Sequence, residues 1–168
     1  MSQAENKVSW CVKKAQKELA KGKKHRGLVK TVSDIEEAKK HIAKAEHNLK
    51  AALNFEKNFP DWSVSALFYV IYHCFLAIIA KYCYESRNQE CTIALIEYLT
   101  EQKTIDISSE LITALKTTDV EETQQRTMIA MRENFQYGTE TSVKELRLEE
   151  LKKLSRQAIE EAKNIIYT

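Results

Sequence analysis

Apolar residues recur along this chain every three to four positions, which predicts a succession of amphipathic helices. The first helix is expected to begin at Ser2, where Ser-Gln-Ala-Glu forms a capping box, and to end at Gly22. The second is expected to begin at Ser33 with another capping box and to reach about Asn58, because Pro60 disfavours helix at the residue before it. Between them, the stretch Gly-Lys-Lys-His-Arg-Gly-Leu-Val-Lys is expected to be a basic loop.

Five further helices complete the pattern. Four of them are expected at about 62–84, 89–101, 107–115 and 144–166. The other is expected to begin after a cap at Thr118 or Asp119 and to end at Tyr137. Only three glycines and one proline interrupt the chain, and the loops are short, which favours antiparallel neighbours. We therefore expect an all-α antiparallel helical bundle. Residues 1–32, an N-terminal helix and basic loop, belong to the same domain as a bundle of residues 33–168.

The most apolar stretch, residues 64–80, approaches the length of a membrane span. A span needs about 20 apolar residues, and this stretch is shorter and contains Ser65, Tyr69, Tyr72 and His73. We interpret it as the central helix of a soluble bundle and expect no membrane partner. The polar start of the chain does not resemble a signal peptide, so we expect a cytoplasmic protein.

Charge is spread unevenly along the chain. Residues 1–50 carry thirteen Lys and Arg against six Asp and Glu, although the net charge of the whole chain is only +2. A basic segment of this kind either binds phosphate or forms a solvated helix face. The candidate nucleic-acid patch lacks interleaved aromatic residues for base stacking; it consists of Lys13, Lys14, Lys17, Lys21, Lys23, Lys24 and Arg26.

Neither a metal site nor a cofactor is indicated. Cys11, Cys74, Cys83 and Cys91 show no paired Cys-x-x-Cys spacing, so reduced thiols are the simplest expectation. His41 and His47 are six residues apart, and they cannot share a metal on one helix face. The chain has too few glycines for a glycine-rich phosphate loop.

A polar ridge runs along the apolar central helix. Ser65, Tyr69 and His73 are spaced four residues apart, which places them on one helix face, with Tyr72 at its edge. Buried hydroxyl and imidazole groups cost about 1–3 kcal/mol each when they lack a partner. The ridge should therefore face polar groups, or its members should bond to backbone carbonyls.

The best partner for this ridge is the stretch Arg-Glu-Asn-Phe-Gln-Tyr-Gly, residues 132–138. It combines a permanent cation, Arg132, with Asn134, Gln136 and the phenol of Tyr137 near the end of a helix. Arg132 and Gln136 share a helix face, whereas Tyr137 points elsewhere unless the helix unwinds. A guanidinium binds phosphate oxygens bidentately, so we expect a phosphate or nucleotide site formed by Arg132, Ser65, Tyr69, His73, Asn134 and Gln136.

The central helix resembles that of the HEPN (higher eukaryotes and prokaryotes nucleotide-binding) family in its small archaeal and bacterial members. Those members carry a Ser-x-x-Tyr/Phe-Tyr-x-x-Phe/Tyr-His-x-x-x-Ala pattern, which is similar to Ser65, Phe68, Tyr69, Tyr72, His73 and Ala77. Residues 132–138 resemble the family's signature Arg followed by a terminal His or Tyr. The resemblance runs from about residue 36 to the end, and residues 1–30, with Trp10 and Cys11, resemble an archaeal extension.

The resemblance implies a homodimer that handles RNA or nucleotides. HEPN ribonucleases use Arg-x4–6-His from both subunits for metal-independent RNA cleavage, but this chain has Tyr137 in place of the His. A phenol has an unperturbed pKa near 10 and an imidazole near 6.5, so Tyr137 is a poor general base at neutral pH. A ribonuclease in which Arg132 and Tyr137 are nevertheless catalytic, aided by His73, is one alternative.

The Arg-x4-Tyr form resembles HEPN proteins that are encoded beside a minimal nucleotidyltransferase, as in toxin–antitoxin pairs. The HEPN protein is then the toxin-like or substrate partner, with Tyr137 as nucleotide acceptor and Arg132 steadying the phosphate. The other alternative is a non-catalytic helical module that docks a protein or RNA partner.

Overall fold

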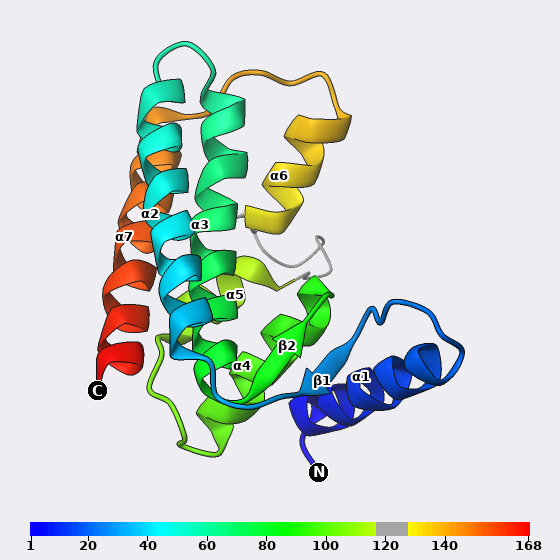
Figure 1. Cartoon of the computed structure of the whole chain (residues 1–168). Coiled ribbons are helices and arrows are strands. Elements are labelled where there is room, and N and C mark those ends of the chain that lie inside the picture. Colours follow the sequence, from blue (N-terminus) through cyan, green and yellow to red (C-terminus); the bar gives the residue numbers. More distant parts are fainter. Residues whose placement is uncertain (117–127) are drawn as a thin grey trace.

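A computed structural model describes residues 1–116 and 128–168 and confirms the all-α prediction. The long helices α2 (Ile35–Phe55), α3 (Pro60–Lys81) and α7 (Glu145–Tyr167) stand side by side, and α6 (Met128–Tyr137) lies along α3 (Figure 1). The shorter helices α4 (Gln89–Glu101) and α5 (Ser109–Leu115) close the lower end of the bundle, and α1 (Gln3–Ala20) packs across α4.

Helix α3 is the centre of the hydrophobic core. Thirteen of its residues are buried, and its neighbours α2, α4, α6 and α7 contact it from different sides. Among the described residues it is the one helix long and apolar enough to cross a membrane, yet 67% of its most apolar window is buried inside the fold. It is therefore the core helix of a globular bundle, which fits a soluble protein.

The local signals predicted most helix ends to within a few residues. Ser2 accepts a hydrogen bond from the Glu5 backbone N–H at 3.1 Å, as a capping residue should, and Gly22 takes a positive φ of 69° after α1. The N-cap predicted at Ser33 is wrong by one residue. Asp34 caps α2 instead, because its carboxylate accepts from the Glu37 N–H at 2.9 Å. The caps predicted at Thr118 or Asp119 lie outside the described residues.

The expected basic loop contains a short strand that the helical pattern did not predict. Strand β1 (Leu28–Lys30) pairs antiparallel with β2 (Tyr84–Ser86), which also shortens the third expected helix at its C-terminal end. Gly27 allows this path close to α1, since a Cβ there would lie 2.3 Å from the backbone oxygen of Cys11. Sequence periodicity misses such three-residue strands because they are too short to alternate.

The prediction of four reduced thiols is wrong for two of them. Cys11 of α1 and Cys91 of α4 form a disulfide, with both side chains fully buried. Helix packing brings them together across 80 residues of sequence, so no Cys-x-x-Cys spacing could reveal the pair. Cys74 and Cys83 are free.

Candidate functional site

Arg132 of α6 lies in the core against the polar ridge of α3. Its side chain is only 9% exposed; one terminal nitrogen donates to the Tyr69 hydroxyl at 2.8 Å, and the guanidinium lies 4.5 Å from the centroid of the Phe68 ring. The predicted meeting of this segment with the ridge therefore occurs, and it occurs at Tyr69. Phe68 adds a cation–π contact, which holds the planar guanidinium in place.

The charge of Arg132 is not balanced by the residues that the structure describes. In that part of the chain no carboxylate lies within ion-pair distance of it, and its Nε–H has no hydrogen-bond partner. A buried cation without a counter-charge is costly, as is a buried N–H without an acceptor. Such a group is typical of a site that an anionic ligand completes.

One helical turn away, a pocket of about 270 Å³ opens between the first turns of α3 and the end of α6. Three residues that the sequence singled out, Ser65, Gln136 and Tyr137, line it together with Asp61, Trp62 and Phe135. Ser65 is buried, whereas Trp62 is 58% exposed and Tyr137 is 85% exposed. The pocket therefore has aromatic walls at its mouth and polar groups between them.

The two helices present matching rows to this site. Ser65 and Tyr69 are one turn apart on α3, and Gln136 and Arg132 are one turn apart on α6. Tyr69 bonds to Arg132, while Ser65 and Gln136 line the same pocket. The arrangement places a polar pocket with aromatic walls one helical turn from the buried guanidinium of Arg132, which does not itself line the pocket.

Not every predicted site residue joins this group. The amide of Asn134 donates to Glu140 at 2.7 Å and lines a separate pocket between α6 and the start of α7. Tyr137 lies on the exposed end of α6, so its phenol does not share the buried setting of Arg132. The Arg-x4-Tyr pair is therefore not a compact catalytic pair within one chain.

His73 has a partner on a different helix from the Arg132 segment. Its partner is His41 of α2, with 3.0 Å between the two Nδ1 atoms, and not a backbone carbonyl or the Arg132 segment. Burial, with the nearby His41 and Lys44 charges, lowers the pKa of His73 to about 4, so the imidazole is neutral at pH 7. Burial also lowers the pKa of His41. Tyr72, at the ridge edge, lies 3.5 Å from the Thr92 hydroxyl, and burial raises its pKa.

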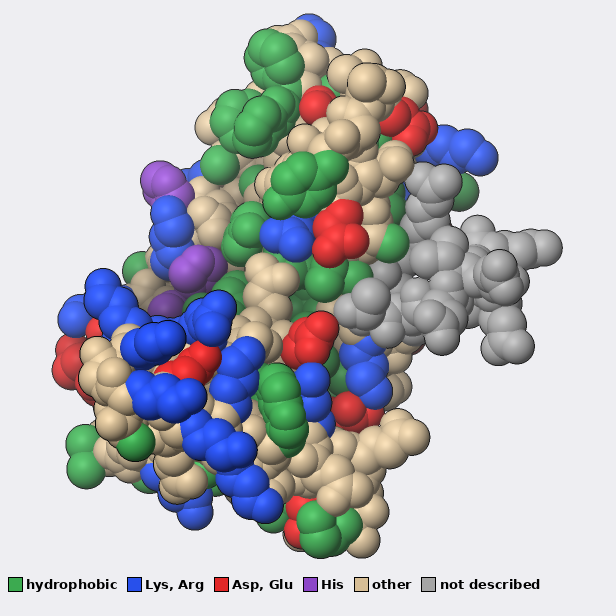
Figure 2. All heavy atoms as spheres, turned by 90° about the vertical axis from the view of Figure 1, so that its right-hand side faces the viewer, with side chains coloured by type: hydrophobic (Ala, Val, Ile, Leu, Met, Phe, Trp, Pro, Cys, Tyr) green, Lys and Arg blue, Asp and Glu red, His purple; other side chains and the backbone are tan. Residues whose placement is uncertain are grey.

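The candidate nucleic-acid patch lies on α1 and the segment after it. All of its side chains are exposed except Lys14, which is half-buried, and Lys and Arg side chains gather over this lower part of the molecule (Figure 2). One aromatic side chain lies beside the patch residues, although none is interleaved among them in the sequence. Trp10 is 50% exposed, and the ammonium groups of Lys7 and Lys14 lie 4.5 and 5.1 Å from its ring centroid.

Sequence reasoning missed three residues of the site: Asp61, Trp62 and Phe135. Asp61 and Trp62 precede Ser65 by four and three residues, which is about one helical turn. Extending the polar ridge by one turn toward the start of the helix would therefore have predicted them. The partnership of His41 with His73 depends on the packing of α2 against α3, which residue spacing within one helix does not reveal. In the described ranges, no group of three or more His, Cys, Asp or Glu side chains could hold a metal ion.

No family model matches the chain, and no curated protein matches it.

Proposed function

We propose that this protein is a HEPN-like, nucleotide-handling protein that binds a nucleotide, free or in RNA, between α3 and α6. The observation that carries the proposal is Arg132, a buried guanidinium with an unpartnered Nε–H and no carboxylate partner among the described residues. A phosphate supplies the missing negative charge and acceptor oxygens. The Arg132–Tyr69 bond and the Phe68 ring fix the guanidinium beforehand, which lowers the cost of ordering it on binding.

The neighbouring pocket supplies a place for the base. Trp62, Phe135 and Tyr137 provide aromatic surface, and stacking of a base on such rings contributes about 1–3 kcal/mol. Asp61, Ser65 and Gln136 provide hydrogen-bonding groups for its edge. In this arrangement the phosphate lies toward Arg132, one turn further along both helices.

In the same proposal Tyr137 is the acceptor of a nucleotidyl group from a minimal nucleotidyltransferase partner, as in a toxin–antitoxin pair in the cytoplasm. The Tyr137 hydroxyl oxygen, which loses its proton, bonds to the α-phosphorus of a nucleoside triphosphate, the bond between the α- and β-phosphates breaks, and pyrophosphate leaves. The Tyr137 side chain is 85% exposed at the end of α6, where a second protein can reach the hydroxyl. A catalytic partnership with Arg132 would require a second copy of the chain, because the two side chains occupy different settings within one copy. A homodimer remains part of the proposal for that reason.

The binding proposal can be tested with Trp62 as a reporter. The chain has two tryptophans, and in a Trp10→Phe background the fluorescence of Trp62 reports the pocket. We expect saturable quenching by ATP or GTP. Arg132→Gln should weaken this binding by about 10- to 100-fold, since a hydrogen bond to a charged group contributes roughly 1.5–3 kcal/mol.

Two controls separate charge from folding. Arg156→Gln removes an exposed guanidinium on α7 and should leave the affinity unchanged. Adenosine, which lacks phosphate, should bind wild type and Arg132→Gln with equal affinity. If Arg132→Gln keeps its circular dichroism spectrum and binds ATP as wild type does, Arg132 is not the phosphate site.

The acceptor proposal has its own test. The protein is incubated with a minimal nucleotidyltransferase of the same genome and labelled ATP, and the modified residue is identified by mass spectrometry. We expect label on wild type and on Tyr167→Phe, a control that removes another exposed phenol, and none on Tyr137→Phe. Equal labelling of all three proteins would reject Tyr137 as the acceptor.

A further inference from the structure

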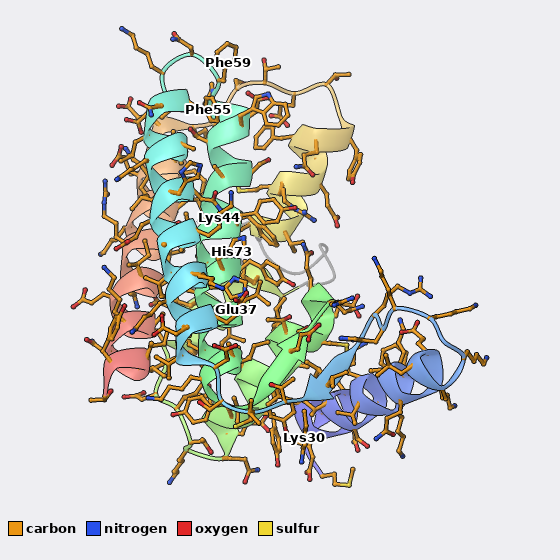
Figure 3. The ribbon with its side chains drawn as sticks, in the orientation of Figure 1. Lys30, Glu37, Lys44, Phe55, Phe59 and His73 are labelled. Carbon is orange, nitrogen blue, oxygen red and sulfur yellow. A yellow bond between two sulfur atoms is a disulfide. The ribbon has the colours of Figure 1, made fainter. Side chains whose placement is uncertain are left out.

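A pair of histidines bridges α2 and α3 away from the Arg132 site. His41 and His73 belong to two long helices that pack along their length, and their Nδ1 atoms are 3.0 Å apart with ring centroids 5.2 Å apart. Both rings are half-buried, so one edge of the pair is protected and the other is open to water. Figure 3 shows His73 at the seam between the two helices, with Lys44 and Glu37 to either side along α2.

We propose that His41 and His73 form a two-histidine binding site for a divalent transition-metal ion of the Cu²⁺ or Ni²⁺ type. A metal bonded to both Nδ1 atoms at about 2.05 Å would see them at an angle of about 94°, given their 3.0 Å separation. That angle fits two adjacent positions of a square or octahedral ion, whereas a tetrahedral ion needs the nitrogens further apart. Water completes the coordination at the open edge.

A carboxylate lies behind one of the two rings. When Nδ1 bonds a metal, the ring proton must sit on Nε2, and the Nε2 of His41 lies 3.8 Å from a carboxylate oxygen of Glu37. A carboxylate behind a metal-binding imidazole orients the ring and raises its basicity. Burial lowers the pKa of both imidazoles, which favours the neutral form that binds metals.

One neighbour acts against the metal. Lys44 is exposed on α2, and its charge lies close enough to His73 to lower the pKa of that imidazole. The same charge repels a bound dication. The structure therefore assigns opposite effects to two residues of one helix, Glu37 strengthening the site and Lys44 weakening it.

The test uses the full chain in a Cys83→Ser background, which removes the half-buried free thiol as a competing ligand. Ni²⁺ affinity is measured by calorimetry after treatment with a chelator, and the nitrogen splitting of bound Cu²⁺ is read by electron paramagnetic resonance. We expect one Ni²⁺ per chain, two bound nitrogens, and a higher thermal midpoint with metal. His73→Ala and His41→Ala should each lower the affinity at least tenfold, and Lys44→Gln should raise it.

The matched control is His47→Ala, which removes an exposed histidine from the same helix and should change nothing. His73→Gln, a closer match in size, guards against misfolding of the alanine variant. Nickel affinity that survives in a folded His41→Gln/His73→Gln double variant, or that falls equally in His47→Ala, would overturn the proposal.

Discussion

Reduction of the Cys11–Cys91 disulfide should destabilise the protein strongly. The bond closes a loop of 80 residues of sequence separation and ties α1 to α4. In the chain-entropy treatment, a cross-link that closes a loop of that length lowers the entropy of the unfolded chain. At 25 °C this stabilises the folded state by about 4.5 kcal/mol. That is a large share of the roughly 5–15 kcal/mol that holds a typical domain together.

The assay is guanidinium unfolding followed by circular dichroism, with and without a phosphine reductant. Reduced wild type keeps both sulfur atoms in the core, so the difference measures the tether and not a lost packing contact. Cys83→Ser serves as the control, because it removes a thiol that is not in the disulfide. Thiol titration of the denatured, unreduced protein should count two free thiols, Cys74 and Cys83. Four free thiols, or a difference in free energy of unfolding below about 1 kcal/mol, would refute the reasoning.

Three further outcomes follow from particular contacts. Tyr69→Phe removes the hydroxyl that Arg132 donates to at 2.8 Å, so nucleotide affinity should fall about tenfold in the Trp62 fluorescence assay while adenosine binding stays constant. Gly27→Ala places a Cβ against the Cys11 backbone oxygen, at 2.3 Å before relaxation. It should lower the free energy of unfolding by about 1–3 kcal/mol, measured by denaturant titration. Gly22→Ala is the comparison variant, because Gly22 has open space around it and a positive φ, so that its substitution tests backbone strain without a clash. With chelator present, the pKa of His73 should be about 4 by NMR, below its ordinary 6.5. The unfolded state then takes up the proton first as the pH falls, so the free energy of unfolding should decrease from pH 6.5 toward pH 4. A titration midpoint of His73 near 6.5 would contradict the burial of its ring.

Helical periodicity was a sufficient guide to the fold because the helices are long and their apolar faces regular. The bounds of α4, Gln89–Glu101, follow directly from its pattern, and Ser2 and Gly22 predicted the ends of α1. Helical periodicity could not predict the contacts between elements that are distant in sequence. Strands β1 and β2 exist only as a pair, and Cys11 and Cys91 meet only because α1 lies on α4.

The candidate site also has features that local spacing predicted and features that only helix packing decides. The spacing of Ser65, Tyr69 and His73 correctly predicted one polar face on α3, since that regularity is local. Which helix each residue meets is a tertiary fact. The ridge turns out to serve two neighbours, because Tyr69 meets α6 while His73 meets α2.

The Arg132 site and the histidine pair are neighbours along α3 but share no contacting residue. Arg132 and His41 lie on different helices and reach α3 one turn apart, at Tyr69 and His73. Tyr69 and Tyr72 place aromatic rings between the two, with centroids 6.5 Å apart, and Tyr72 lies 6.3 Å from His73. A nucleotide at the Arg132 site and a metal ion at the histidine pair would therefore both contact α3, although they would contact different side chains. Substitution of His41 should leave the nucleotide affinity of the Arg132 site intact, and substitution of Arg132 should leave nickel binding intact, because the two sets of contacting side chains do not overlap.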